Sequence, residues 1–227
     1  SLRSIYERKK KSIILISIFT PILTEEFFRY TSVFYHAEEY NHLENISYIT
    51  YKDYTLFSKK ENEIDSLFIF YPGAKVENKA YIELAETIAD EGIDVALCSM
   101  PFNLAFFGIN KANKIIKKLY YSHIYIGGPS LRGAMASSFA YKNGNKLDEV
   151  ILLGSYATKI MPNNLKCLSL MKSNDKIVKK DKFEKNKEFF NKNLYIEMII
   201  EGINHSIFGN YGLQNKYGIT ENSNLKQ

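Results

Sequence analysis

The sequence predicts a single α/β domain built on a mostly parallel sheet. Beyond residue 45, short apolar segments alternate with segments whose apolar residues have helical spacing, which is typical of a parallel sheet with connecting helices. Residues 66–71 form a nearly continuous apolar run, as expected for a strand covered on both faces. The chain has 227 residues and is 45% hydrophobic, which is enough for one sizeable core.

Each element follows from its local pattern. Two strand-like segments flank Lys52 and Asp53 and predict a hairpin. The expected strands are 46–51, 54–57, 66–71, 94–98, 123–127, 148–154, 165–171 and 194–200. The expected helices are 78–91, 109–119, 130–141 and 181–191, the last of them charged and exposed. The short connection between 154 and 165 leaves no room for a large lid.

The first 45 residues differ in character from the rest. A basic cluster at residues 8–11 precedes a short apolar stretch at 12–24, which Pro21 interrupts and Glu25 ends. A basic flank before an apolar stretch is typical of a signal peptide or anchor, but this one is shorter than the roughly 20 residues of a spanning helix. We therefore expect an N-terminal segment over 1–45 and a folded domain over 46–227. Membrane association or export, an amphipathic helix and a cytoplasmic location all remain open.

Charge and residue composition indicate which partners and bound groups to expect. The net charge is +5 and most basic residues are spread along the chain, which favours a solvated surface over nucleic-acid binding. Cys98 and Cys167 lie in apolar strand-like runs, so we expect buried thiols rather than a disulfide. His36 and His42 lack the partner cluster of a metal site and are expected to have surface or packing roles, and His123 a structural one. We expect no metal or other cofactor.

One segment carries a chemical motif. The strand 123–127 runs into Gly-Gly-Pro-Ser-Leu-Arg-Gly at residues 127–133 and then directly into a helix. A serine on a sharp strand-to-helix turn is close to the G-x-S-x-G nucleophile elbow, which exposes the hydroxyl above the sheet and beside the helix N-terminus. Ser130 is thus a candidate nucleophile, although serine is also favoured as an ordinary helix N-cap.

A serine nucleophile needs a base and an orienting acid. Asp175 comes just after the strand 165–171, and His205 comes just after the strand 194–200 and is the only histidine after Ser130. The order Ser, Asp, His is the one expected when a G-x-S-x-G elbow carries the nucleophile. Asp181 is a rival acid, but its position fits a helix start better. For the oxyanion hole we expect the Leu131 N–H and, from the loop after 66–71, the Ala74 N–H, with Lys75 as second choice.

Four blocks together carry a family resemblance: residues 71–76, 127–133, 173–175 and 202–212. In this order the chain resembles the α/β-hydrolase fold superfamily and, more narrowly, small bacterial hydrolases of the dienelactone-hydrolase-like type. The resemblance implies a mostly parallel central sheet with helices on both faces. It also implies a serine hydrolase that cleaves an ester, thioester or lactone of a small acyl substrate through Ser130, His205 and Asp175.

The elbow departs from the pattern of such relatives, Gly-His-Ser-Leu-Gly-Gly, at two positions. Pro129 replaces the histidine and lacks an N–H, and Arg132 puts a long side chain where the turn prefers none. A displacement of the Ser130 hydroxyl by about 1 Å would be enough to weaken catalysis badly. A catalytically impaired binding protein is therefore the alternative function. Arg132 is also a candidate for binding an anionic substrate group.

Overall fold

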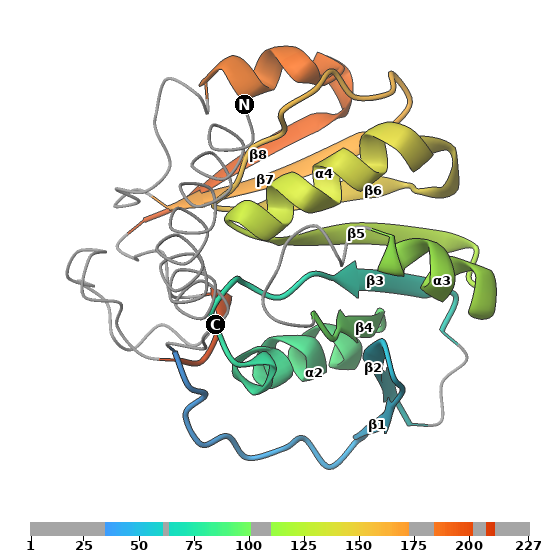
Figure 1. Ribbon diagram of the computed structural model, residues 1–227, viewed down its shortest axis with the longest axis vertical. Helices are drawn as coiled ribbons and strands as arrows, with labels where there is room; N and C mark the ends of the chain where they lie inside the picture. The colour runs from blue at the N-terminus through green and yellow to red at the C-terminus, as the bar shows by residue number, and fades with distance from the viewer. Residues whose placement is uncertain (1–34, 61–63, 101–109, 173–183, 202–207, 212–227) are drawn as a thin grey trace, which may run out of the picture.

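The computed structural model describes residues 35–60, 64–100, 110–172, 184–201 and 208–211. Within them, eight strands form one sheet in the order β1-β2-β4-β3-β5-β6-β7-β8 (Figure 1). The first two strands form an antiparallel hairpin and β2 is antiparallel to β4, whereas all other neighbouring strands are parallel. The predicted mostly parallel sheet is confirmed.

All eight predicted strands are present, with ends that differ by a few residues. The strands are β1 Ile46–Thr50, β2 Tyr54–Lys59, β3 Ser66–Phe70, β4 Asp94–Cys98, β5 His123–Pro129, β6 Glu149–Leu153, β7 Lys166–Lys172 and β8 Tyr195–Ile200. The helices are α2 Ile82–Asp90, α3 Lys111–Lys118 and α4 Leu131–Asn143, with 3₁₀ turns η1 Asn78–Tyr81, η4 Gly144–Lys146, η5 Lys187–Phe189 and η6 Lys192–Leu194.

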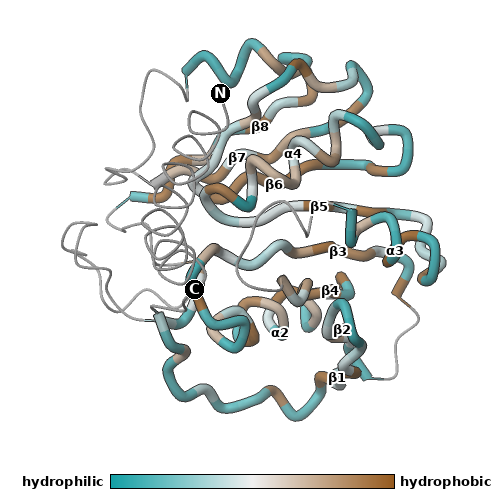
Figure 2. The backbone as a smooth tube through the Cα atoms, viewed as in Figure 1, coloured by the Kyte–Doolittle hydropathy of each residue, from teal (hydrophilic) through white to brown (hydrophobic). Residues whose placement is uncertain are grey.

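Helices cover both faces of the sheet because alternate side chains of a strand point to opposite sides. Leu67 and Ile69 of β3 pack in one cluster with residues of α3 and α4. Phe68 and Phe70 pack in a second cluster with residues of α2. Figure 2 shows hydrophobic stretches along β3 and β5, between these layers. The continuous apolar run predicted this two-sided burial correctly.

Two helical predictions need correction. The segment expected as one helix over 78–91 begins as the 3₁₀ turn η1 before α2. In the described part of 181–191, Asn186 is fully buried, so the expectation of a wholly exposed helix was wrong there. The reason is that the Asn186 side-chain carbonyl accepts the Ala157 N–H (2.5 Å) and thereby satisfies a buried backbone donor in the loop after β6.

The chain before β1 lies along the domain. We call residues 35–45 the N-terminal strap; it is the blue segment of Figure 1 and is largely hydrophilic in Figure 2. The Glu86 carboxylate of α2, only 1% exposed, accepts the Leu43 N–H (2.9 Å) and pairs with His42 Nδ1 (2.7 Å). At its start, the Tyr35 N–H donates to the Lys75 carbonyl oxygen (3.2 Å). The strap is thus fastened to the same domain as the sheet.

The cysteine prediction is confirmed. Cys98 and Cys167 are both buried free thiols. Burial raises the pKa of Cys98 to about 12 and also raises that of Cys167.

In the part of the chain that the structure describes, no helix is both long and apolar enough to cross a membrane.

Candidate active site

The candidate nucleophile lies in a strained turn. β5 ends at Pro129, α4 begins at Leu131, and Ser130 between them has φ 50° and ψ −131°. Only two described residues other than glycine have a positive φ, Ser130 and Lys75. Such a conformation costs about 1–3 kcal/mol and persists only where the surroundings enforce it, which is common at functional sites. The backbone therefore has the sharp strand-to-helix turn that the motif predicts.

Backbone and side-chain contacts hold this turn. The Ser130 N–H donates to the Leu153 carbonyl oxygen at the end of β6 (3.0 Å). The Ser130 carbonyl oxygen accepts the Gly133 N–H (3.0 Å) and the Ser155 hydroxyl (2.6 Å). The Ser130 side chain makes no capping hydrogen bond to α4. The serine is therefore not used as an N-cap.

Small residues around Ser130 are required by close packing. A Cβ at Gly128 would collide with the Tyr71 carbonyl oxygen, and a Cβ at Gly133 would lie 2.6 Å from Ser155 Oγ. At either position, a side-chain Cβ would lie closer to these atoms than real Cβ atoms do. The glycines thus let β5, β3 and the start of α4 approach one another closely.

The two departures from the usual elbow are accommodated. Pro129 is the last residue of β5 and pairs in parallel register with Leu153. Arg132 is 1% exposed, and its Nη1 lies 3.5 Å from Met135 Sδ. Its positive charge is close enough to the Tyr71 and Cys98 side chains to lower their pKa values, against the larger effect of burial. The long side chain therefore lies in the interior and leaves the positive φ of Ser130 intact.

The expected second oxyanion donor lies in the loop of residues 71–77, which we call the β3–η1 loop. Its Lys75 has φ 64°. Tyr35 of the strap pairs with this loop: its carbonyl oxygen accepts the Glu77 N–H (2.9 Å), and its N–H bonds to Lys75 as described above. The Gly73 N–H is within hydrogen-bonding reach of the Tyr81 hydroxyl of η1 and lowers the pKa of that hydroxyl. Ala74 therefore lies between two anchored neighbours.

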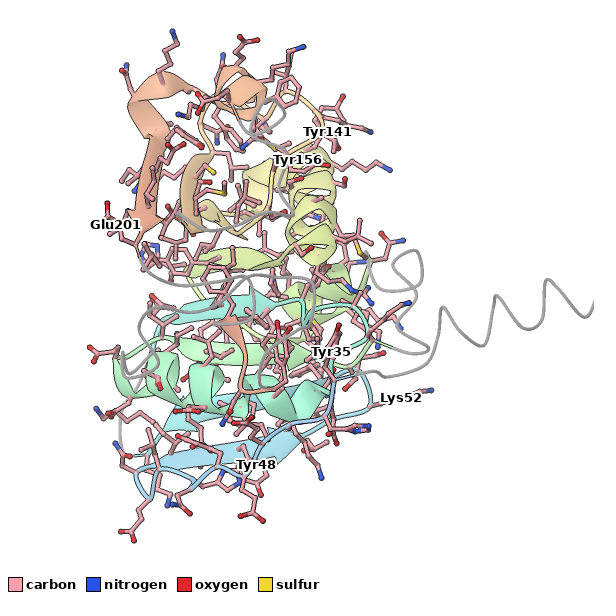
Figure 3. The ribbon with its side chains drawn as sticks, turned by 90° about the vertical axis from the view of Figure 1, so that its left-hand side faces the viewer. Tyr35, Tyr48, Lys52, Tyr141, Tyr156 and Glu201 are labelled. Atoms are coloured by element: carbon pink, nitrogen blue, oxygen red, sulfur yellow. The ribbon has the colours of Figure 1, made fainter. Side chains whose placement is uncertain are left out.

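Asp175 and His205 lie outside the described residues, so the structure gives no geometry for either. The described strands before them end at Lys172 and Ile200. Because β5, β7 and β8 run parallel, these strand ends share the sheet edge that carries Ser130. Figure 3 shows this edge, with Glu201, which follows β8, labelled.

The chain after His205 is described again at residues 208–211. There the Asn210 N–H donates to the Ala80 carbonyl oxygen of η1 (2.6 Å), on the far side of the elbow from β8. Phe208 and Tyr211 are buried in the cluster that contains α2. The elbow thus lies between the end of β8 and the next described segment of the chain.

Two residues that hold the site were missed by the sequence analysis. Ser155 follows Gly154 at the end of β6, and its only sequence signal is a small polar pair after a buried strand. Tyr81 lies within the expected helix 78–91, a pattern that does not reveal the use of its hydroxyl.

The described histidines form contacts with single carboxylates. The nitrogen–oxygen distances are 3.7 Å for His36–Glu77 and 3.5 Å for His123–Asp148, and with His42–Glu86 all three rings are more than half exposed. Among the described residues, no group of three His, Cys, Asp or Glu side chains could hold a metal ion.

Comparisons with known proteins agree with this architecture. Three of the matching solved structures are 11–15% identical in sequence to this chain; for each, the parentheses give the TM-score and then the covered share of this chain and of that chain. They are a thioesterase domain from a curacin biosynthetic pathway (TM-score 0.54; 74% and 95%), Est1E from Butyrivibrio proteoclasticus (0.56; 72% and 91%) and a predicted CIB-like hydrolase from Thermoplasma acidophilum (0.51; 72% and 89%). No curated protein matches. Residues 67–227 match the model of the alpha/beta hydrolase family. The chain therefore belongs to the alpha/beta hydrolase family.

Proposed function

We propose that the chain is a serine hydrolase that cleaves an ester, thioester or lactone through an acyl-enzyme. Ser130 attacks the carbonyl carbon, His205 takes the hydroxyl proton and returns it to the leaving group, and Asp175 orients His205. The Leu131 and Ala74 N–H groups stabilise the oxyanion, with Lys75 as the other candidate from its loop. The observation that carries the proposal is the conformation of Ser130.

That conformation supports a nucleophile for a physical reason. Strain of about 1–3 kcal/mol is retained at Ser130, although the side chain gives no capping hydrogen bond in return. The turn lies at the carboxyl end of the central strand β5, where open α/β sheets bind their ligands. It also lies at the N-terminus of α4, a helix of 13 residues whose dipole favours a developing negative charge.

The placement of the surrounding segments supports the other roles. Strands lie about 4.8 Å apart, so the four steps from β8 to β3 span roughly 19 Å. The nine residue steps from Glu201 to Asn210 reach at most about 30 Å, so the chain is long enough to carry a residue between them to the elbow. His205, the only histidine between these two points, is the base that we propose. The hydrogen bond from Gly73 to Tyr81 favours Ala74 over its neighbour Gly73 as an oxyanion donor.

The test is covalent labelling with a fluorophosphonate probe, read by intact mass. Wild type should gain one probe adduct and Ser130→Ala none. Ser137→Ala is the matched control, because Ser137 is a buried serine of α4, the helix that follows Ser130, with its hydroxyl bonded to the Ala134 carbonyl oxygen (2.7 Å). It should label like wild type. Hydrolysis of a panel of short-chain esters, thioesters and lactones then identifies the bond that is cleaved.

A folded wild type that gains no adduct, or a Ser130→Ala protein that still gains one, would contradict the proposal. The first result would favour the alternative of a binding protein without catalysis, with Pro129 and Arg132 as the residues responsible.

A further inference from the structure

Two loops of the candidate site meet at one buried hydroxyl. Tyr81, the last residue of η1, is 1% exposed. Its hydroxyl lies against the Gly73 backbone of the β3–η1 loop, and the Gly73 N–H and the Tyr211 hydroxyl are both within hydrogen-bonding reach of it and shift its pKa. Gly73 immediately precedes the expected oxyanion donor, and Tyr211 belongs to the segment that follows the expected base.

Packing fixes the ring that carries this hydroxyl. The Tyr81 ring centroid lies 5.2 Å from that of Phe70 and 6.2 Å from that of Tyr211. A Cβ at Gly73 would collide with the Tyr81 hydroxyl oxygen, whereas it would lie 3.4 Å from the ring carbon that bears the hydroxyl. Gly73 thus gives the backbone the close approach that the hydrogen bond needs.

A second set of contacts ties the same segment to η1 and α2. Besides its N–H bond to Ala80, Asn210 donates from its side-chain amide to the Glu83 carboxylate (3.1 Å). Its carbonyl oxygen accepts the Glu38 N–H of the strap (3.0 Å). The Tyr211 ring also lies 5.8 Å from that of Tyr35, which pairs with the β3–η1 loop. The two loops are therefore held against one common support.

We infer that Tyr81 is a positioning residue of the active site, whose hydroxyl fixes the oxyanion loop at Gly73 relative to the segment at Tyr211, which follows the expected base in the sequence. The inference rests on the proposed serine hydrolase function. The hydroxyl stays neutral at working pH, since burial raises the pKa of Tyr81 well above its ordinary value. A neutral hydroxyl accepts one hydrogen bond and shares its own proton in another, which is what a bridge between two loops requires.

The bridge matters for rate because its loss leaves Gly73 with a buried N–H that has lost its acceptor. The loop then relaxes, and an oxyanion donor displaced by about 1 Å stabilises the transition state much less. Ground-state binding of the acyl group depends on other side chains and should change little.

The test is Tyr81→Phe, which keeps the ring and removes the hydroxyl. We expect kcat to fall by about 10- to 100-fold with KM within about threefold of wild type. Tyr121→Phe is the matched control: its hydroxyl donates to the Asp94 carboxylate (2.5 Å) at the opposite end of the sheet. Because it also loses a hydroxyl bonded in the fold, it should lose stability but keep kcat. Unchanged kcat in an active Tyr81→Phe enzyme would overturn the inference.

Amide hydrogen exchange tests the bridge without catalysis. In Tyr81→Phe, residues 73–77 and 208–211 should both exchange faster than in wild type, and neither should do so in Tyr121→Phe. If wild type fails to label at Ser130, the proposed function is wrong. The exchange measurement then tests by itself whether the Tyr81 hydroxyl links the two segments. Unchanged exchange of either segment would overturn it.

A second pair of variants tests the geometry at Gly73. Gly73→Ala should lower Tm markedly in wild type, because the new Cβ meets the Tyr81 hydroxyl. In the Tyr81→Phe background the same substitution should cost much less, since the nearest ring carbon is then 3.4 Å away. Equal losses of Tm in both backgrounds would contradict the close approach on which the bridge depends.

Discussion

Ser155→Ala tests how the nucleophile is held in its strained turn. The Ser155 hydroxyl is buried and donates to the Ser130 carbonyl oxygen at 2.6 Å. A hydrogen bond of this kind contributes about 0.5–1.5 kcal/mol net. That range is comparable with the roughly 1–3 kcal/mol of strain in the Ser130 backbone, so its loss should shift Ser130 measurably toward relaxed conformations.

The expected size of the effect follows from these free energies. If the lost free energy acts wholly on the strained turn, the equilibrium constant between the strained and relaxed turns falls by about two- to tenfold, and kcat/KM should fall by up to the same factor. Tm should fall by about 2–4 °C per kcal/mol for a domain of this size. Activity is measured as the second-order rate of fluorophosphonate labelling, and Tm by thermal unfolding.

Ser137→Ala provides the comparison. It removes an equally buried hydroxyl whose bond, 2.7 Å to the Ala134 carbonyl oxygen, lies within α4 and away from the turn. It should lower Tm by a similar amount and leave the labelling rate unchanged. A Ser155→Ala protein that labels as fast as wild type, or a Ser137→Ala protein that slows equally, would refute the reasoning.

Three further predictions concern the interior. Burial raises the pKa of Asp94 above its value in the unfolded chain, which is about 4. The ionised carboxylate therefore destabilises the fold above the raised pKa. This destabilisation disappears as the pH falls toward the pKa of the unfolded chain. Asp94→Asn should therefore raise Tm at about pH 8, with a gain that shrinks on acidification; a pH-independent Tm difference would contradict this. Cys98 and Cys167, buried with raised pKa values, should not react with a thiol reagent in the native protein but should both react in denaturant. Pro129→His combined with Arg132→Gly should raise the labelling rate by no more than about threefold, because Ser130 already has its strained turn. A large gain would instead favour the impaired binding protein.

The sequence predicted the sheet well because burial on two faces leaves a strong local signal. The apolar runs of β3, β4 and β5 mark their strands within two residues, and the chain order of the motifs predicts one sheet edge for Ser130. The turn itself was also foreseeable. A serine between a strand and a helix, with glycines on either side, restricts the backbone to few conformations.

The consequences of Arg132 were not predictable from its position in the motif. A long side chain after a tight turn was expected to disturb it, yet the arginine turns into the interior beside Met135. Whether a side chain finds such space depends on residues distant in sequence, here Tyr71 and Cys98 at the ends of two other strands. The roles of the Ser155 and Tyr81 hydroxyls were not predictable for the same reason, since each contacts a loop that only tertiary packing brings near.

By composition the N-terminal strap belongs to the N-terminal segment, but by its contacts it belongs to the same domain as the sheet. Composition changes near residue 45, but the strap before it is bound through partly buried polar contacts. Glu77 accepts the Ala37 N–H (3.1 Å), and Glu86 would be left as a buried carboxylate without two of its partners if the strap were removed. Removing Tyr35 would also free the β3–η1 loop, which carries the expected oxyanion donor Ala74. A shortened chain that is meant to isolate the role of the N-terminal apolar stretch must therefore keep the strap; otherwise a loss of activity would report on the oxyanion loop instead.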